Sequence, residues 1–190
     1  NGLKGGMNQV QQIWNEFFHN QKKLVFRSEQ ILAEKEKTTI ESKYKLLLKD
    51  LEDIKGETAI REVKTRVNQY VFRQMVLNNY STQCAITGID IPELLFASHI
   101  IPWSESEKER LNPENGICLS PLYDKAFDCG LIGIDTNYKI VLSKSLKSNL
   151  TSPFYASHFA SIENKKISQP LNYLPRKAFL EFHLDVIFKG

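Results

Sequence analysis

The stretch FASHIIPWSESEKERLNPENGICLSPLYDKAFDCG, residues 96–130, decides which fold we expect for this chain of 190 residues. An apolar, β-prone run ends at His99 and a polar loop follows it. A second short apolar run begins just after Asn115. Ser120 and Pro121 then have the pattern of an N-cap and the first residue of a helix. The order predicts two strands, joined by a loop and followed by a helix.

Four side chains in this stretch suit metal-assisted cleavage of a phosphodiester. His99 can accept a proton near neutral pH. Asp124 and Asp128 are four residues apart on the expected helix, so both carboxylates face one side and can share a divalent ion. Asn115 is expected to fix the loop between the strands. Because all ligands would be oxygens, Mg²⁺ or Mn²⁺ is favoured over zinc. The pattern predicts a nuclease site.

The end of the expected helix bears on Asp128. Gly130 stands where a left-handed C-terminal cap belongs, which places Asp128 in the last turn. The helix dipole disfavours an anion there. A carboxylate at an unfavourable position indicates a functional use, and simple solvent exposure remains the alternative.

Four motifs in the chain resemble the ββα-metal core of HNH endonucleases, in particular their restriction-type branch. They are CAITG at 84–88, ASHIIPW at 97–103, NPENG at 112–116 and LSPLYDKAFDCGLI at 119–132. The resemblance implies an α+β fold with His99 as the general base. It also implies that Asn115 pins the loop and that Asp124 is a metal ligand. Asp128 falls where relatives carry a second ligand.

The sequence departs from the HNH pattern at two places. Many members have an Asp or His just before the base as a metal ligand, and this chain has Ser98, which is a weak candidate ligand. Other members bind a structural zinc through two C-x-x-C pairs. Here Thr87 stands three residues after Cys84, where the second cysteine of a pair would be. The pair that would begin at Cys118 also lacks its second cysteine. We therefore predict no structural zinc.

The rest of the chain is expected to add helices and a hairpin around this core. We divide it near Gly56 into an N-terminal helical extension, residues 1–55, and an HNH domain, residues 56–190. Further helices are expected at 58–80 and 175–188, and a β-hairpin at 131–142. The extension has an aromatic helical face and an apolar stripe from Ile40 to Ile54. Packing on its own chain is the simpler interpretation of that stripe, and a homodimer contact is the alternative.

Charge is unevenly distributed along the chain, whose net charge is +3. The residues around the predicted site, 74–138, have 3 Lys and Arg against 9 Asp and Glu, whereas both flanks are basic. An acidic site needs basic flanks to hold a DNA backbone. An R-x-x-Q-x-x-F-R stretch that is similar to the HNH family pattern contains Phe72. The predicted DNA contacts are Arg61, Lys64, Arg66, Arg73, Arg110, Lys144 and Lys147.

Other features limit the class of protein. Three cysteines without an N-terminal signal segment do not predict a disulfide framework. No apolar window is long enough for a membrane span. We therefore expect a cytoplasmic protein without membrane contact.

Of the remaining histidines, His158 is expected in a loop and His183 in helix packing.

These observations predict a DNA endonuclease that requires Mg²⁺ or Mn²⁺ and acts on double-stranded DNA, leaving 5'-phosphate and 3'-hydroxyl ends. We expect it to be the cutting part of a restriction or modification-dependent restriction system. The alternative is an inactive nucleic-acid-binding module on the same scaffold. The intact set of His99, Asn115 and Asp124 favours the enzyme.

Overall fold

The structure is a computed structural model that describes residues 27–28, 31–38, 42, 57–149 and 151–190. Contacts divide the chain into two units, Asn1–Val71 and Phe72–Gly190. The division falls inside a helix. The predicted boundary near Gly56 and most of the predicted N-terminal extension, including its apolar stripe, lie outside the described residues. The boundary and the homodimer contact therefore stay predictions.

The first unit contains a short helical stretch at residues 31–35 and most of helix α5, Glu57–Asn79. This helix confirms the one predicted at 58–80. Val67 is buried on it, whereas the side chain of Lys64 is exposed. The last turns of α5, from Phe72, belong to the second unit. No described helix has both the length and the apolarity that a membrane span requires.

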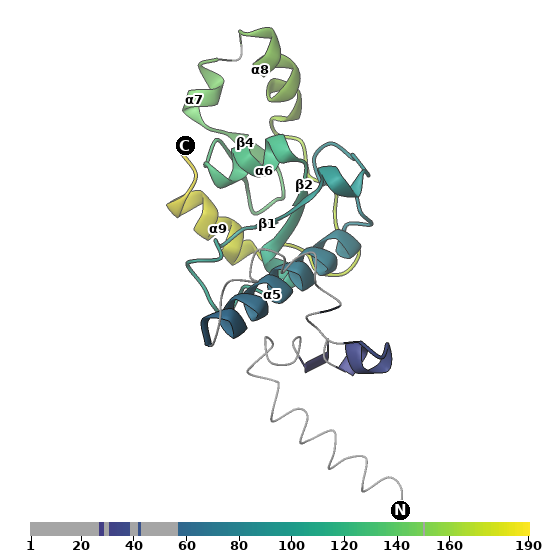
Figure 1. Cartoon of the computed structure of the whole chain (residues 1–190). Helices are drawn as coiled ribbons and strands as arrows, with labels where there is room; N and C mark the ends of the chain where they lie inside the picture. The colour runs from purple at the N-terminus through teal and green to yellow at the C-terminus, as the bar shows by residue number, and fades with distance from the viewer. Residues whose placement is uncertain (1–26, 29–30, 39–41, 43–56, 150) are drawn as a thin grey trace, which may run out of the picture. The chain divides into compact units, whose positions relative to one another are not determined.

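The second unit contains the predicted catalytic segment, and Figure 1 shows the order of its elements. After the end of α5 the chain forms η2 (Pro92–Leu94), β1 (Phe96–His99), η3 (Pro113–Asn115), β2 (Gly116–Leu119), α6 (Pro121–Asp128), β3 (Ile132–Ile134), β4 (Ile140–Leu142), α7 (Lys144–Lys147), α8 (Pro153–His158), η4 (Ala160–Ile162) and α9 (Lys177–Val186).

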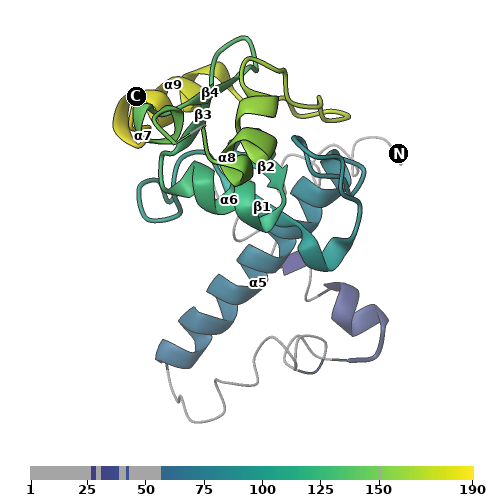
Figure 2. The same cartoon turned by 90° about the horizontal axis from the view of Figure 1, so that it is seen from above.

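Strands β1 and β2 and helix α6 form the predicted ββα unit. The strands are antiparallel, and His99 pairs with Gly116 at the loop end of the ladder. All four residues of β2 are buried. Helix α6 follows directly and packs against β1, as Figures 1 and 2 show. The α+β fold is thus confirmed, although β1 is shorter than the apolar run that predicted it, because Leu94 ends a 3-10 turn.

Helix α6 ends as its sequence predicts. Gly130 has a φ of 69°, in the left-handed region. The N–H of Gly130 donates to Phe127 O at 2.9 Å and that of Leu131 to Ala126 O at 2.8 Å, which is the Schellman pattern. A Cβ at Gly130 would come within 2.0 Å of the Ile187 carbonyl, so both conformation and space require glycine. The cap fixes Asp128 as the last helical residue.

Two further predictions concern the C-terminal third of the chain. Strands β3 and β4 form an antiparallel pair, and α9 packs against β3, which confirms the hairpin and the closing helix. His158 was expected in a loop, and this was wrong: it is the last residue of α8. Pro153 begins that helix with Ser152 as its N-cap residue, the same pattern that begins α6.

Candidate active site

The imidazole of His99 is held in one protonation form by a backbone contact. Its Nε2 lies 3.0 Å from the carbonyl oxygen of Arg110. A carbonyl oxygen can only accept, so Nε2 carries the proton and Nδ1 of the neutral ring keeps its lone pair. Burial lowers the pKa of His99, and the positive charge of Arg110 adds to this effect, although the hydrogen bond to the Arg110 carbonyl opposes it. His99 therefore has the properties of a base.

Two aromatic rings enclose His99. The Phe72 ring stacks on the imidazole with a centroid distance of 3.7 Å and an interplanar angle of 13°. Trp103 meets it edge-on, with a centroid distance of 5.4 Å. Phe72 was not among the predicted site residues. It stands inside the R-x-x-Q-x-x-F-R stretch, but only the structure shows that its ring contacts His99.

Asn115 closes the loop between β1 and β2 and is 1% exposed. Its Oδ1 accepts the N–H of Ile101 at 2.8 Å, and its Nδ2 donates to the carbonyls of Ile101 and Glu109, both at 3.1 Å. Glu109 directly precedes Arg110, whose carbonyl holds His99. The amide thus links both ends of the loop that orients the imidazole.

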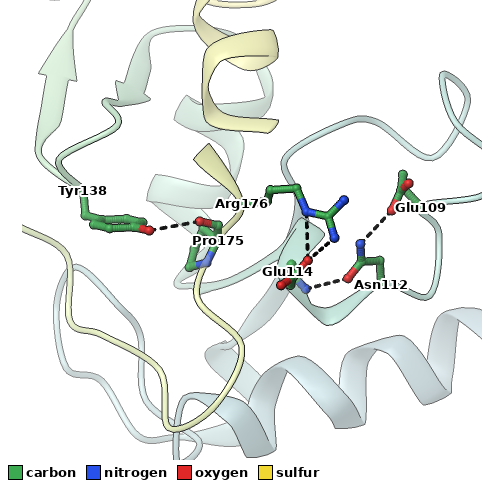
Figure 3. A network of polar contacts seen from close by, with 6 residues as sticks. All are labelled: Glu109, Asn112, Glu114, Tyr138, Pro175 and Arg176. Carbon is green, nitrogen blue, oxygen red and sulfur yellow. Dashed lines mark hydrogen bonds and ion pairs between the residues drawn. The ribbon is translucent and has the colours of Figure 1, made fainter. Parts of the chain in front are cut away.

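A C-terminal segment reinforces this loop from outside, as Figure 3 shows. Arg176 forms an ion pair with Glu114, the neighbour of Asn115, through Nη2 and through Nε at 2.9 Å. The backbone N–H of Arg176 also donates to the Glu114 carbonyl at 3.1 Å. Asn112, on the same turn, donates to the carboxylate of Glu109 at 2.7 Å. These contacts tie η3 to the start of α9.

The structure brings Ser98 and Asp124 together. The buried Ser98 hydroxyl donates a hydrogen bond to Oδ1 of Asp124. Ser98 precedes His99 on β1, so this bond joins the strand that carries the base to the helix that carries the carboxylate. Ser98 was a candidate metal ligand. Its contact here is with a predicted ligand, which orients that carboxylate.

Asp128 interacts electrostatically with Asp124. Asp128 lies at the surface, yet partial burial of its carboxyl group raises its pKa, and the charge of Asp124 raises it further. Lys125 opposes the shift. Two carboxylates on successive turns whose charges repel are a donor set that a divalent cation would stabilise.

The described residues do not gather three His, Cys, Asp or Glu side chains at one point as a metal-binding group. This donor set suits Mg²⁺ or Mn²⁺, because Mg²⁺ usually keeps several waters and takes only one or two carboxylates plus substrate phosphate. Asp124 and Asp128 therefore fit a water-rich site that substrate helps to complete.

Helix α6 is anchored at both ends, which fixes its carboxylates. Near its start, the hydroxyl of Tyr123 donates to the carbonyl of His158 at 2.7 Å. At its end, Nε2 of His183 donates to the carbonyl of Phe127 at 3.1 Å, and the two rings stack with a centroid distance of 3.7 Å. The expected packing role of His183 agrees with these contacts.

The buried His183 predicts a pH-dependent stability. Burial lowers its pKa to about 4 from 6.5, so between these values the unfolded chain binds a proton that the folded chain excludes. Stability therefore falls as pH falls through that window. From pH 7 to pH 5 we expect a loss of about 2 kcal/mol from this residue. Urea unfolding at pH 7 and pH 5 measures this loss, and His183→Phe should lose less free energy of unfolding between the two pH values than the parent. An equal loss in both proteins would contradict the role given to His183.

The predicted DNA contacts have different surroundings. Arg73 donates to the carbonyls of Leu95 and Pro92, ahead of β1. Arg110 donates from Nε to the Trp103 carbonyl at 2.8 Å and lies over the Trp103 ring. These two guanidinium groups thus already support the loops at the site. Of the others, Lys64 and Lys144 are exposed, Arg66 is half-buried, Lys147 pairs with Glu163 at 2.7 Å, and Arg61 is placed only as a residue of α5.

Cys84 takes part in positioning α6. Its Sγ accepts the N–H of Ser120 at 3.2 Å and that of Thr87 at 3.4 Å. Although burial raises the pKa of this thiol, hydrogen bonds from Thr87, Ile86 and Ser120 outweigh burial and lower it. The absence of a structural zinc remains a prediction.

Comparison with known sequences supports the expected family. Residues 84–135 match the sequence model of the HNH endonuclease family, a range that contains β1, β2, α6 and β3. No curated protein matched the chain. The match confirms that this segment resembles HNH endonucleases. The restriction-type branch remains a prediction.

Proposed function

We propose that the HNH endonuclease core of this chain hydrolyses phosphodiester bonds of double-stranded DNA, with His99 as the general base. The observation that carries this proposal is the fixed protonation form of His99. Since the Arg110 carbonyl occupies Nε2, Nδ1 is the atom that takes a proton from the attacking water. The water oxygen bonds to phosphorus as the P–O bond to the 3' oxygen breaks, and the departing oxygen takes up a proton from solvent, which gives 5'-phosphate and 3'-hydroxyl ends.

We assign a divalent ion, Mg²⁺ or Mn²⁺, to Asp124 and Asp128. When bound, such an ion neutralises charge on the scissile phosphate and on the departing oxygen. Ser98 orients the Asp124 carboxylate through its hydroxyl, and the anchors of α6 hold the helix in place. The four-residue spacing puts both carboxylates on one side of that helix. Asn115 supports the base through the loop.

A restriction or modification-dependent restriction system is the biological setting that we propose. One base and one ion act on one scissile phosphate, so cutting both strands needs two active sites. We assign the second site to another copy of the chain, in a homodimer built by the N-terminal extension. The basic residues Lys64, Arg66, Lys144 and Lys147, together with Arg61, are proposed to contact the DNA backbone. An inactive binding module on the same scaffold is the competing function.

Metal removal separates these two functions. We expect the protein to nick supercoiled plasmid in Mg²⁺ or Mn²⁺ and to lose this activity in EDTA, because the acidic site needs a cation before it can hold a phosphate. Added Mg²⁺ or Mn²⁺ should restore nicking. Plasmid binding without any nicking, at every metal concentration, would favour the inactive module.

Elemental analysis that found one cysteine-bound zinc per chain would contradict the predicted zinc-free core.

A further inference from the structure

We propose that Phe72 is a positioning residue for the base: its ring, stacked on His99, fixes the plane of the imidazole and directs Nδ1 toward the attacking water. This inference rests on the proposed function, and it assigns a task to a residue of α5 that lies outside the matched segment 84–135. Phe72 is 2% exposed and His99 is half-buried.

The geometry leaves His99 little freedom. The Phe72 ring is nearly parallel to the imidazole at 3.7 Å, so rotation of the imidazole about its Cβ–Cγ bond would drive its edge into the phenyl ring. The hydrogen bond to the Arg110 carbonyl fixes the direction of Nε2 within that plane. Trp103 closes a further side edge-on. Stack and hydrogen bond together define where Nδ1 points.

The strand opposite His99 is built to admit Phe72. Gly116 is the cross-strand partner of His99. A Cβ at Gly116 would lie 2.9 Å from Cζ of Phe72 and 2.3 Å from Cγ2 of Val76. A side chain there would displace both residues. The bare backbone at Gly116 thus allows α5 to approach the ladder closely enough for Phe72 to reach the imidazole.

The test uses Phe72→Leu in the full chain, which keeps an apolar group but removes the flat ring. We expect the single-turnover nicking rate at saturating protein to fall about ten- to hundred-fold, because a base displaced by about 1 Å can lose that much. The protein concentration that gives half the maximal rate should change less than twofold. Nitrogen NMR should show His99 as one tautomer, protonated at Nε2, in the parent. It should show a mixture in Phe72→Leu, because an imidazole that can turn out of its plane loses the hydrogen bond to the Arg110 carbonyl that fixes the tautomer.

Val76→Ala is the matched control. Val76 is one turn along α5, is fully buried and faces the same Gly116, but no ring contact joins it to His99. It should lose stability while keeping the nicking rate and the single tautomer. Equal loss of rate in both variants, or an unchanged rate and tautomer in Phe72→Leu, would overturn the proposal.

The NMR measurement needs no activity, so it separates this inference from the proposed function. If the parent does not cleave DNA but holds His99 in one tautomer that Phe72→Leu releases, the proposed function fails and the positioning contact stands. If Phe72→Leu does not fold, Phe72→Met replaces it with the same expected results. Two tautomers in the parent protein would overturn the proposal without any variant.

Discussion

Replacing His99 with Ala is expected to abolish plasmid nicking while the chain stays folded and still binds DNA. Loss of a general base costs about 10²–10⁴-fold or more in rate. The substitution also removes the ring that stacks on Phe72 and the donor to the Arg110 carbonyl, so a modest loss of stability should accompany it. Circular dichroism and a DNA-binding assay check the fold and the binding. Nicking at the parental rate would refute the assignment of the base.

His158→Ala is the control, because His158 is a half-buried histidine of α8 whose ring contacts Ser157 and the Phe154 carbonyl. It should cut at the parental rate.

The lowered pKa of His99 adds a second check. Since the neutral ring is the base and its pKa lies below 6.5, more than half of the activity seen at higher pH should remain at pH 6.5. A half-maximal point above pH 6.5 would show that burial does not control the base.

The elements that the sequence predicted correctly are those with local causes. Pro121 begins α6 and Gly130 ends it, and both effects come from the backbone of the residue itself. The hairpin is similar, because the Asp135 side chain accepts the N–H groups of Asn137 and Lys139 within the turn. Helix α8, which was not predicted, begins with the same local signal, Ser152 followed by Pro153.

The contacts that the sequence could not predict join segments far apart in the chain. Ser98 and Asp124 are 26 residues apart, and nothing in their spacing shows that the hydroxyl is used by the carboxylate. Arg73 was predicted to contact phosphate because it is basic, and that contact stays a prediction. Nothing in the sequence shows that its guanidinium also donates to the carbonyls of Leu95 and Pro92. A charge pattern gives the number of basic side chains, but it does not show which of them already donate hydrogen bonds within the protein.

Asn115 is the residue at which predicted chemistry and observed packing agree most closely, so Asn115→Ala should have a large effect on stability. The change leaves the Ile101 N–H and the carbonyls of Ile101 and Glu109 without their partner in a half-buried loop. Each such group costs about 1–3 kcal/mol when fully buried. Because water can reach this half-buried loop, we expect a total loss at the low end, about 3–5 kcal/mol in the free energy of unfolding. Urea denaturation followed by circular dichroism measures it.

Asn112→Ala makes a sharp comparison because it changes the same residue type three positions earlier. Asn112 is half-buried, and its Oδ1 accepts the Glu114 N–H at 3.0 Å as a cap of η3. Loss of such a cap costs about 1 kcal/mol. Asn115→Ala should also slow nicking under conditions where it remains folded, because the freed loop carries the Arg110 carbonyl that orients His99. If the two variants lose equal stability and equal rate, Asn115 does not hold the loop as we infer.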